Sequence, residues 1–262
     1  MDTDTWITDF ESVSKNALAR DWFVSPLEYH WTVSKNVFDD IFRSEGSPHK
    51  HFDEMVSPYL YRATMHVDFR AKMMVYAFMR EQIAKDFGVE IESGLLSLYQ
   101  LDFLPCLSQW IYVVEGYCRK LFLVSSSSNV RSKDWTIPTT GLAVWDRLIK
   151  SLSDALARYL DGVMFKAVSD PHLERLSRHL LLHGNAENKN FFSQKNCLLL
   201  MFIIDSLLVI EMVKNGHFPA VFDSHPGEVD RVERRKTLYN LQLKHVFEDV
   251  SLLKIDILKE HV

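Results

Sequence analysis

The chain has 262 residues, of which 47% are hydrophobic and 25% charged, as is ordinary for a globular protein with a buried core. Its formal charge of −5 gives it no overall attraction to nucleic acid, so any contact with RNA must come from a local basic patch. Only 9 glycines and 8 prolines interrupt the sequence, which favours long helices over many short strands. We therefore expect an all-α fold.

Cysteine usage and the N-terminal sequence point to the cytoplasm. Three cysteines lie in apolar surroundings without C-x-x-C spacing, which indicates reduced core residues and neither a disulfide framework nor a zinc site. The acidic N-terminus has no apolar signal region. The apolar run from Cys197 to Val213 is short for a membrane span and contains Asp205 and Glu211, so we interpret it as a buried helix and expect no contact with a membrane. The cysteines are Cys106, Cys118 and Cys197.

Residues 1–92 are interpreted as an N-terminal helical region of unknown role. Apolar residues between Trp6 and Leu18 predict a first helix, and Pro26 is well placed to begin a second one that reaches Phe42. Ser57 and Pro58 are typical of the cap and first turn of a long helix, which we expect to continue to about Phe87.

Residues 93–262 are interpreted as a second helical unit with a C-terminal helical extension. Its first helix has an apolar stripe with alternating spacings of three and four residues, which is typical of a helix face turned toward a core. Pro105 falls within this stripe and predicts a kink or a restart. The stripe consists of Leu101, Leu104, Ser108, Ile111, Glu115, Cys118 and Phe122.

Capping residues predict where the later helices begin and end. Thr140 is expected to cap the second helix of this unit, and Asp170 with Pro171 to open a short third helix that stops at Gly184. Ser193 is expected to cap a fourth, apolar helix, in which Asp205 is a buried partner for some donor. The segment 228–260 contains neither glycine nor proline and is also expected to be helical.

The segment Arg178-His179-Leu180-Leu181-Leu182-His183-Gly184 carries the strongest functional signal. It places a fixed cation, a polar neighbour and a titratable imidazole close together, as metal-free cleavage of a phosphodiester requires. The segment resembles the R-x4-H signature of the HEPN superfamily, small helical domains that often act as ribonucleases in bacterial defence and toxin systems. The expected order of helices over roughly residues 95–215 also resembles the HEPN layout, so the resemblance implies a HEPN-type helical bundle.

The resemblance implies a role for each residue of the motif. His183 is expected to transfer a proton at the ribose 2′-oxygen or the leaving oxygen, and Arg178 to hold the phosphate with its planar fork. His179 fills the polar position of the motif and is expected to orient His183 or to touch the substrate. Asn185 is expected to line the cleft. The reaction implied is endonucleolytic, needs no metal or cofactor, and leaves a 2′,3′-cyclic phosphate.

Two further residues bear on the site and its partners. Glu115 lies on an apolar stripe, where an unpaired carboxylate is costly, so we expect it to pair with Arg178 or Arg175. Asn185 stands where HEPN toxins silenced by a nucleotidyltransferase antitoxin typically carry a tyrosine, so control by tyrosine modification is not expected. An antitoxin or regulatory partner of another kind is left open.

Helical geometry provides an argument for a homodimer. Leu173, Leu176 and Leu180 share one face of the expected motif helix, which should pack on the core. Arg178 points nearly opposite, and Leu181 and Leu182 fall on its side. A cation paired with two leucines is unusual on a monomer surface, so we expect a second copy to cover this face.

Other interpretations remain open. Arg178 and His183 are also the cations that a helix C-terminus favours, without further function. The acidic charge of the whole chain favours a non-catalytic HEPN-like module for dimerisation or partner binding. A helical regulator anchored by the basic cluster Arg231, Arg234, Arg235 and Lys236 is a further alternative, although a solvated helix face explains that cluster equally well.

Overall fold

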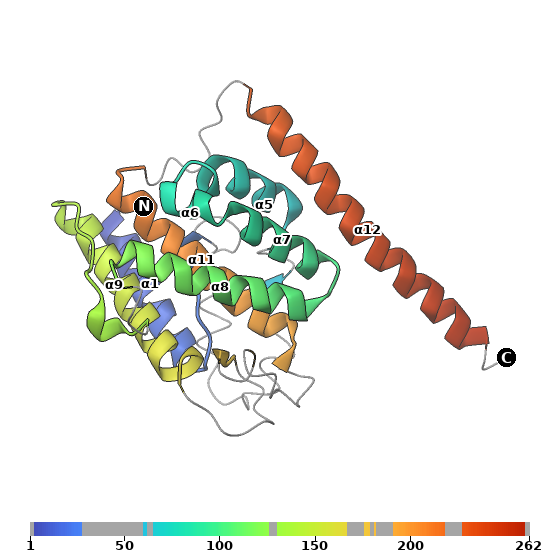
Figure 1. Cartoon of the computed structure of the whole chain (residues 1–262), viewed down its shortest axis with the longest axis horizontal. Helices are drawn as coiled ribbons and strands as arrows, with labels where there is room; N and C mark the ends of the chain where they lie inside the picture. The colour runs from blue at the N-terminus through green and yellow to red at the C-terminus, as the bar shows by residue number, and fades with distance from the viewer. Residues whose placement is uncertain are drawn as a thin grey trace.

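The protein is described by a computed structural model, which covers residues 3–27, 60–61, 65–125, 130–166, 176–178, 181, 191–217 and 227–259 (Figure 1). Eight α-helices and no strand occur in these ranges, so the predicted all-α class is confirmed. In chain order the elements are α1 (Thr3–Leu18), α5 (Val67–Met73), π-helical turn η1 (Met74–Phe78), α6 (Gln82–Asp86), α7 (Gly88–Tyr99), α8 (Phe103–Leu121), 3-10 turn η2 (Ser132–Asp134), α9 (Ala143–Tyr159), π-helical turn η3 (Leu160–Met164), α11 (Gln194–Lys214) and α12 (Val229–Lys259).

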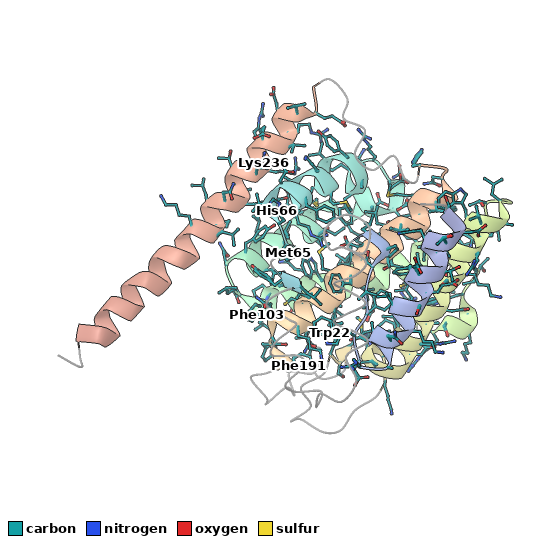
Figure 2. All side chains as sticks on the ribbon, turned by 180° about the vertical axis from the view of Figure 1, so that it is seen from behind. Trp22, Met65, His66, Phe103, Phe191 and Lys236 are labelled. Atoms are coloured by element: carbon teal, nitrogen blue, oxygen red, sulfur yellow. The ribbon has the colours of Figure 1, made fainter. Side chains whose placement is uncertain are left out.

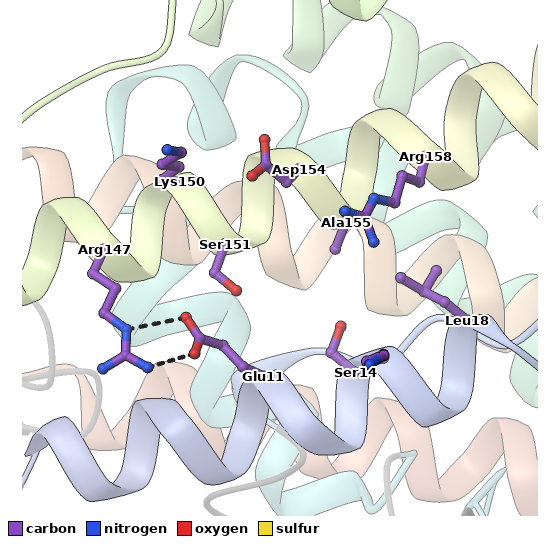
Figure 3. Close-up of a pocket in the computed structure, with 10 residues that line it drawn as sticks. Glu11, Ser14, Leu18, Arg147, Lys150, Ser151, Asp154, Ala155 and Arg158 are labelled. Carbon is purple, nitrogen blue, oxygen red and sulfur yellow. Dashed lines mark hydrogen bonds and ion pairs between the residues drawn. The ribbon is translucent and has the colours of Figure 1, made fainter.

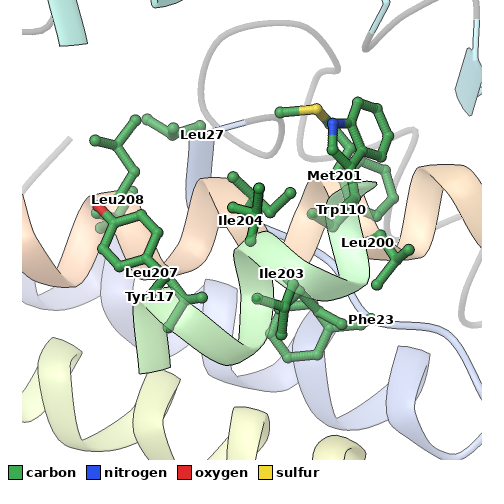
Figure 4. Close-up of a cluster of buried hydrophobic side chains, with 14 of the residues drawn as sticks. Phe23, Leu27, Trp110, Tyr117, Leu200, Met201, Ile203, Ile204, Leu207 and Leu208 are labelled. Atoms are coloured by element: carbon green, nitrogen blue, oxygen red, sulfur yellow. The ribbon is translucent and has the colours of Figure 1, made fainter. Parts of the chain in front are cut away.

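Helix α11 is the centre of the bundle. Every residue from Asn196 to Val213 is buried, and the helix packs against α8, α9 and η1. Figure 4 shows part of this core, in which Trp110 and Tyr117 of α8 lie among apolar side chains of α11. By length and composition α11 is the one helix of the described ranges that could cross a membrane, yet its whole apolar window is buried by the rest of the chain. The prediction of a buried helix is confirmed.

The expected cap of α11 is also present. The side chain of Ser193 accepts a hydrogen bond from the backbone N–H of Asn196 at 3.4 Å. The helix ends at Asn215 and Gly216, where glycine adopts the left-handed φ of 73° that other residues avoid. The first helix and the C-terminal helix are present as predicted, as α1 and α12.

A buried ion pair joins α11 to α5. Arg70 Nη1 donates to Asp205 Oδ2 at 2.7 Å, and both side chains are at most 1% exposed. The expected buried donor for Asp205 is therefore Arg70. A charge removed from water in this way is tolerated only while its partner is present. The pair consequently fixes the position of α5 against the central helix.

The single long helix predicted from Ser57 to about Phe87 is wrong, because the chain is not helical at Met65 and His66, before α5, and breaks again after η1. The α5–η1 helix ends at Phe78, and a new helix, α6, begins at Gln82. The physical reason lies on α11, where the carboxylate of Glu211 accepts hydrogen bonds from the backbone N–H groups of Ile83 and Ala84 at 2.7 and 3.1 Å. These N–H groups belong to the first turn of α6, so Glu211 stabilises a helix start in the middle of an apolar pattern.

The predicted division between residues 92 and 93 falls inside α7, which runs without a break from Gly88 to Tyr99. Helices on both sides of it contribute to one hydrophobic core. Helices α7 and α8 pack very closely, because a Cβ atom on Gly94 would lie 2.2 Å from Nε1 of Trp110. Trp110 donates from that nitrogen to the carbonyl of Ile91 at 3.2 Å.

The core-facing stripe predicted for α8 is only partly correct. Ile111, Cys118 and Phe122 are buried, whereas Leu101 and Leu104 are 42% and 50% exposed. The helix begins at Phe103, which places Pro105 in its first turn and confirms the restart that this proline predicted. Helix α8 is apolar nearly all round, and contacts with α7 and α11 select the face that is buried. That face consists of Cys106, Leu107, Trp110, Ile111, Val113, Val114, Tyr117, Cys118 and Leu121.

Thr140 is not the N-cap residue of α9, which is Leu142, but it forms hydrogen bonds just before the helix begins. Its hydroxyl accepts from the backbone N–H of Leu142 at 3.0 Å and donates to Asp146 at 2.9 Å. On α9, Ile149, Leu152, Leu156 and Tyr159 are buried, while Leu142, just before the helix, is 59% exposed.

The basic cluster at the start of α12 docks this helix onto its own chain. Arg235 donates to both oxygens of Glu92 on α7, at 2.7 and 3.1 Å, and Lys236 lies 3.1 Å from Asp68 on α5. Figure 2 shows Lys236 close to the segment with Met65 and His66, and these three side chains line a common pocket. Arg231 and Arg234 are exposed, so the solvated-face interpretation holds for only half of the cluster. The C-terminal half of α12 extends away from the other helices (Figure 1).

Breaking the buried pair should be costly. Asp205→Ala leaves Arg70 buried without its carboxylate, and we expect the free energy of unfolding to fall by about 3–5 kcal/mol. Lys72→Ala serves as control, because it removes a half-exposed i,i+4 partner of Asp68 and should cost about 0.5 kcal/mol or less. Urea unfolding measures both. Equal, small losses in the two variants would contradict the role given to the pair.

Candidate active site

Arg178, the cation of the motif, lies beside helix α8. The two residues before it, Leu176 and Ser177, are completely buried and anchor this segment to the core. Nε of Arg178 forms an ion pair with Oε1 of Glu115, with the arginine side chain 40% and the glutamate side chain 20% exposed. Glu115 is thus paired with one of the two arginines expected, and Arg178 is held at the boundary between core and solvent.

This geometry leaves the outer end of the guanidinium available. Glu115 contacts Nε, and Arg178 has no other partner among the described residues. A guanidinium fixed at Nε keeps both terminal nitrogens for a further anion, and two parallel N–H groups match two oxygens of a phosphate. The arrangement is suited to hold an oxyanion. It provides no proton acceptor of its own, because the carboxylate of Glu115 is already engaged.

The other residues of the predicted site lie outside the described part of the chain. These are His183, His179 and Asn185. The expected motif helix is described only at residues 176–178 and 181. Whether the imidazole of His183 converges on Arg178 therefore stays a prediction from the sequence.

Leu181 corrects one step of the dimer argument. The sequence places it on the outer side of the motif helix with Arg178, yet Leu181 is partly buried and packs against the hydrophobic core of its own chain. The core covers it because the backbone here is anchored by Leu176 and Ser177. The outer face thus presents less apolar surface than the 3.6-residue period predicts.

A second polar cluster lies where the C-terminal part of α11 meets the turn before α6. Glu81 is 2% exposed and accepts from Nδ2 of Asn215 at 2.7 Å and from Nδ1 of His217 at 2.6 Å. Tyr117 of α8 donates to Oε2 of Glu211 at 2.6 Å. Sequence reasoning missed the contact of Glu81 with His217, because Glu81 fell inside a predicted helix and the two residues are 136 positions apart.

Burial raises the pKa of Glu211, and the nearby charge of Glu81 adds to this effect. Hydrogen bonds from Tyr117 and from the backbone of Ile83 and Ala84 act in the opposite direction. Burial and the charge of Glu211 in turn hold the pKa of Tyr117 well above its usual value. The cluster is therefore a set of mutually dependent groups that ties α6, α8 and α11 together.

The cysteines are confirmed as core residues with free thiols. Cys106, Cys118 and Cys197 are all buried, and burial raises the pKa values of Cys106 and Cys118. A thiol with a raised pKa is a poor nucleophile and a poor metal ligand. Within the described ranges, no three side chains of histidine, cysteine, aspartate or glutamate are grouped as a metal site requires.

Comparison of the chain with models of protein families, with curated proteins and with solved structures gives no match. The functional assignment therefore rests on the motif residues and on the geometry around Arg178.

The raised pKa of Glu211 predicts a specific pH dependence. The folded state holds this proton more tightly than the unfolded chain, so the group contributes stability below its usual pKa and loses it as the pH rises. We expect the stability of Glu211→Gln, relative to the wild type, to improve as the pH rises above the usual glutamate pKa of about 4.3. Urea unfolding at several pH values measures this difference.

Asp146→Asn provides a control of opposite sign. Hydrogen bonds from Thr140, foremost from its backbone N–H, lower the pKa of Asp146, so its contribution to stability is lost as the pH falls. Relative to the wild type, Asp146→Asn should therefore become less stable as the pH rises. If the stability of both variants, relative to the wild type, changed in the same direction with pH, Glu211 would not be the carboxylate with the raised pKa.

Proposed function

We propose that the protein is a metal-independent endoribonuclease of the HEPN type that acts as a homodimer in the cytoplasm, in bacterial antiphage defence or a toxin system. The motif from Arg178 to Gly184 supports this proposal, together with the order of helices around it. In chain order the described helices α9 and α11 lie before and after the motif, and α11 is apolar as predicted.

The observation that carries the proposal is the state of Arg178. An arginine that only finished a helix would need no partner from another helix. Arg178 is instead held through Nε by Glu115 of α8, next to two completely buried residues, and no other described residue occupies its terminal nitrogens. A fixed cation of this kind stabilises the charge that develops on a phosphate during cleavage without reorganising at the moment of reaction.

The proposed reaction uses the motif as follows. Arg178 holds the phosphate between two nucleotides, and His183 transfers protons at the ribose 2′-oxygen and the leaving oxygen. The 2′-oxygen attacks the phosphorus, the bond to the 5′-oxygen of the next nucleotide breaks, and the product ends in a 2′,3′-cyclic phosphate. His179 and Asn185 orient His183 or contact the substrate. The homodimer and any antitoxin belong to the proposal through the HEPN resemblance alone.

A non-catalytic HEPN-like module for dimerisation or partner binding is the second candidate. Two observations favour it, since the chain has a formal charge of −5 and Glu115 offsets the charge of Arg178. A protein of this kind binds its partner but leaves RNA intact, so the two candidates separate in the same assay.

The assay is cleavage of a labelled RNA by the purified protein with a chelator present. We expect cleavage by the wild type, product ends with a cyclic phosphate, and loss of at least about a hundredfold in rate for Arg178→Ala and for His183→Ala. Arg234→Ala is a matched control, because Arg234 is exposed on α12. Unchanged rates in both motif variants would overturn the catalytic assignment, and an intact wild-type substrate would favour the binding module.

Glu115 is expected to act as a positioning residue for Arg178. Glu115→Ala removes the carboxylate that pairs with Nε, whereas Glu115→Gln keeps a polar side chain of the same shape without the charge. We expect kcat/KM to fall about tenfold for the alanine variant, or roughly 1.4 kcal/mol of transition-state stabilisation, and less for the glutamine variant. Equal activity of all three proteins would show that the ion pair is structural only.

A further inference from the structure

A groove lined by both charged and apolar side chains runs between helices α1 and α9. It consists of two adjoining cavities of about 270 and 290 Å³, which share the side chains of Lys15, Leu18 and Arg158. The two helices pack directly against each other beneath it. Neither Arg178 nor Glu115 lines these cavities.

Positive charge is concentrated in this groove. Together the two cavities are lined by four basic and three acidic side chains, a net charge of +1 in a chain whose total is −5. Arg147 is engaged, because it lies 2.5 Å from Glu11 and 3.7 Å from Asp4. The other three cations are exposed and have no partner among the described residues. They are Lys15, Lys150 and Arg158.

The floor of the groove is formed by small and hydroxyl side chains. Ser14 and Ser151 lie between the two helices, with Ala155 beyond them toward Arg158 (Figure 3). Small side chains let a ligand approach the helices closely, and serine hydroxyls donate to anionic oxygens. The one aromatic residue of the groove, Tyr159, is 2% exposed. No aromatic surface is therefore offered to a base, so the groove is suited to phosphates rather than to nucleobases.

The free cations are also spaced along the groove. Lys150 and Arg158 are eight positions apart on α9, which is about 12 Å along the helix axis. Lys15 lies across from them on α1 and contributes to both cavities. Three cations arranged in this way match successive phosphates of one extended strand better than a single small anion.

We propose that the groove between α1 and α9 binds the phosphodiester backbone of single-stranded RNA through Lys15, Lys150 and Arg158. The choice of RNA rests on the proposed ribonuclease function. Through this groove a chain of net negative charge gains the local basic patch that RNA binding requires. The contacts involve phosphates alone, so binding depends on salt and is independent of base sequence.

The test measures RNA binding separately from cleavage. A labelled oligouridylate is titrated with the full chain carrying Arg178→Ala, and anisotropy is followed at several salt concentrations. Adding Lys15→Gln, Lys150→Gln and Arg158→Gln should weaken binding on the order of tenfold at low salt and reduce the salt slope by about 2, because each contact to a single strand contributes about 0.7.

The matched control carries the same change of charge elsewhere. Lys85→Gln, Lys214→Gln and Arg234→Gln replace two lysines and one arginine that are exposed and line none of the groove. Binding that is weakened only by the groove substitutions supports the proposal. Binding that is unchanged by the groove substitutions, or weakened equally by both sets, overturns it.

The outcomes for the groove and for the ribonuclease are independent. Weakened binding in the groove variant, with no cleavage by the wild type, would refute the ribonuclease and retain the groove. Cleavage by the wild type, with unaltered binding in the groove variant, would retain the ribonuclease and refute the groove.

Discussion

The structure depends on the hydrogen-bond donors that two buried carboxylates of α11 receive from neighbouring helices. A helix enclosed on all sides offers no water to Asp205 and Glu211, so other elements must provide their partners. Arg70 comes from α5, and the donors to Glu211 come from α6 and α8. Apolar packing alone would allow these helices to slide along α11. The directional polar contacts allow only one arrangement, because moving any of these helices would break a hydrogen bond to a buried carboxylate and lower the stability of the fold.

The same contacts explain features that are distant from α11. Because Glu211 receives the N–H groups of Ile83 and Ala84, the chain turns after Phe78 and begins a new helix. That turn places Glu81 against Asn215 and His217 at the end of α11. It also sets the start of α7, whose close packing on Trp110 fixes α8. The orientation of α8 finally decides that Glu115 stands at the edge of the core, where it meets Arg178.

Electrostatics connects the two surfaces to which we assign function. The protein is acidic overall, so an RNA strand meets attraction only where cations lack carboxylate partners. Within the described part of the chain, the groove between α1 and α9 holds three such cations, while Arg178 is paired at Nε and has no second partner. The first arrangement suits loose binding of a backbone, and the second suits a fixed grip on one phosphate. In the proposed function the two tasks belong to different surfaces of the chain.

The sequence by itself determined the helical class, the buried nature of α11, its cap at Ser193, the core position of the cysteines and the pairing of Glu115 with an arginine. These features follow from local capping chemistry, from the 3.6-residue period and from the cost of a buried charge. Only the tertiary structure decided the break before α6, the exposed positions of Leu101 and Leu104, the partial burial of Leu181 and the free cations between α1 and α9. Each of these depends on a partner far away in the chain, such as Glu211 for α6. A local pattern carries no information about which distant element will cover it.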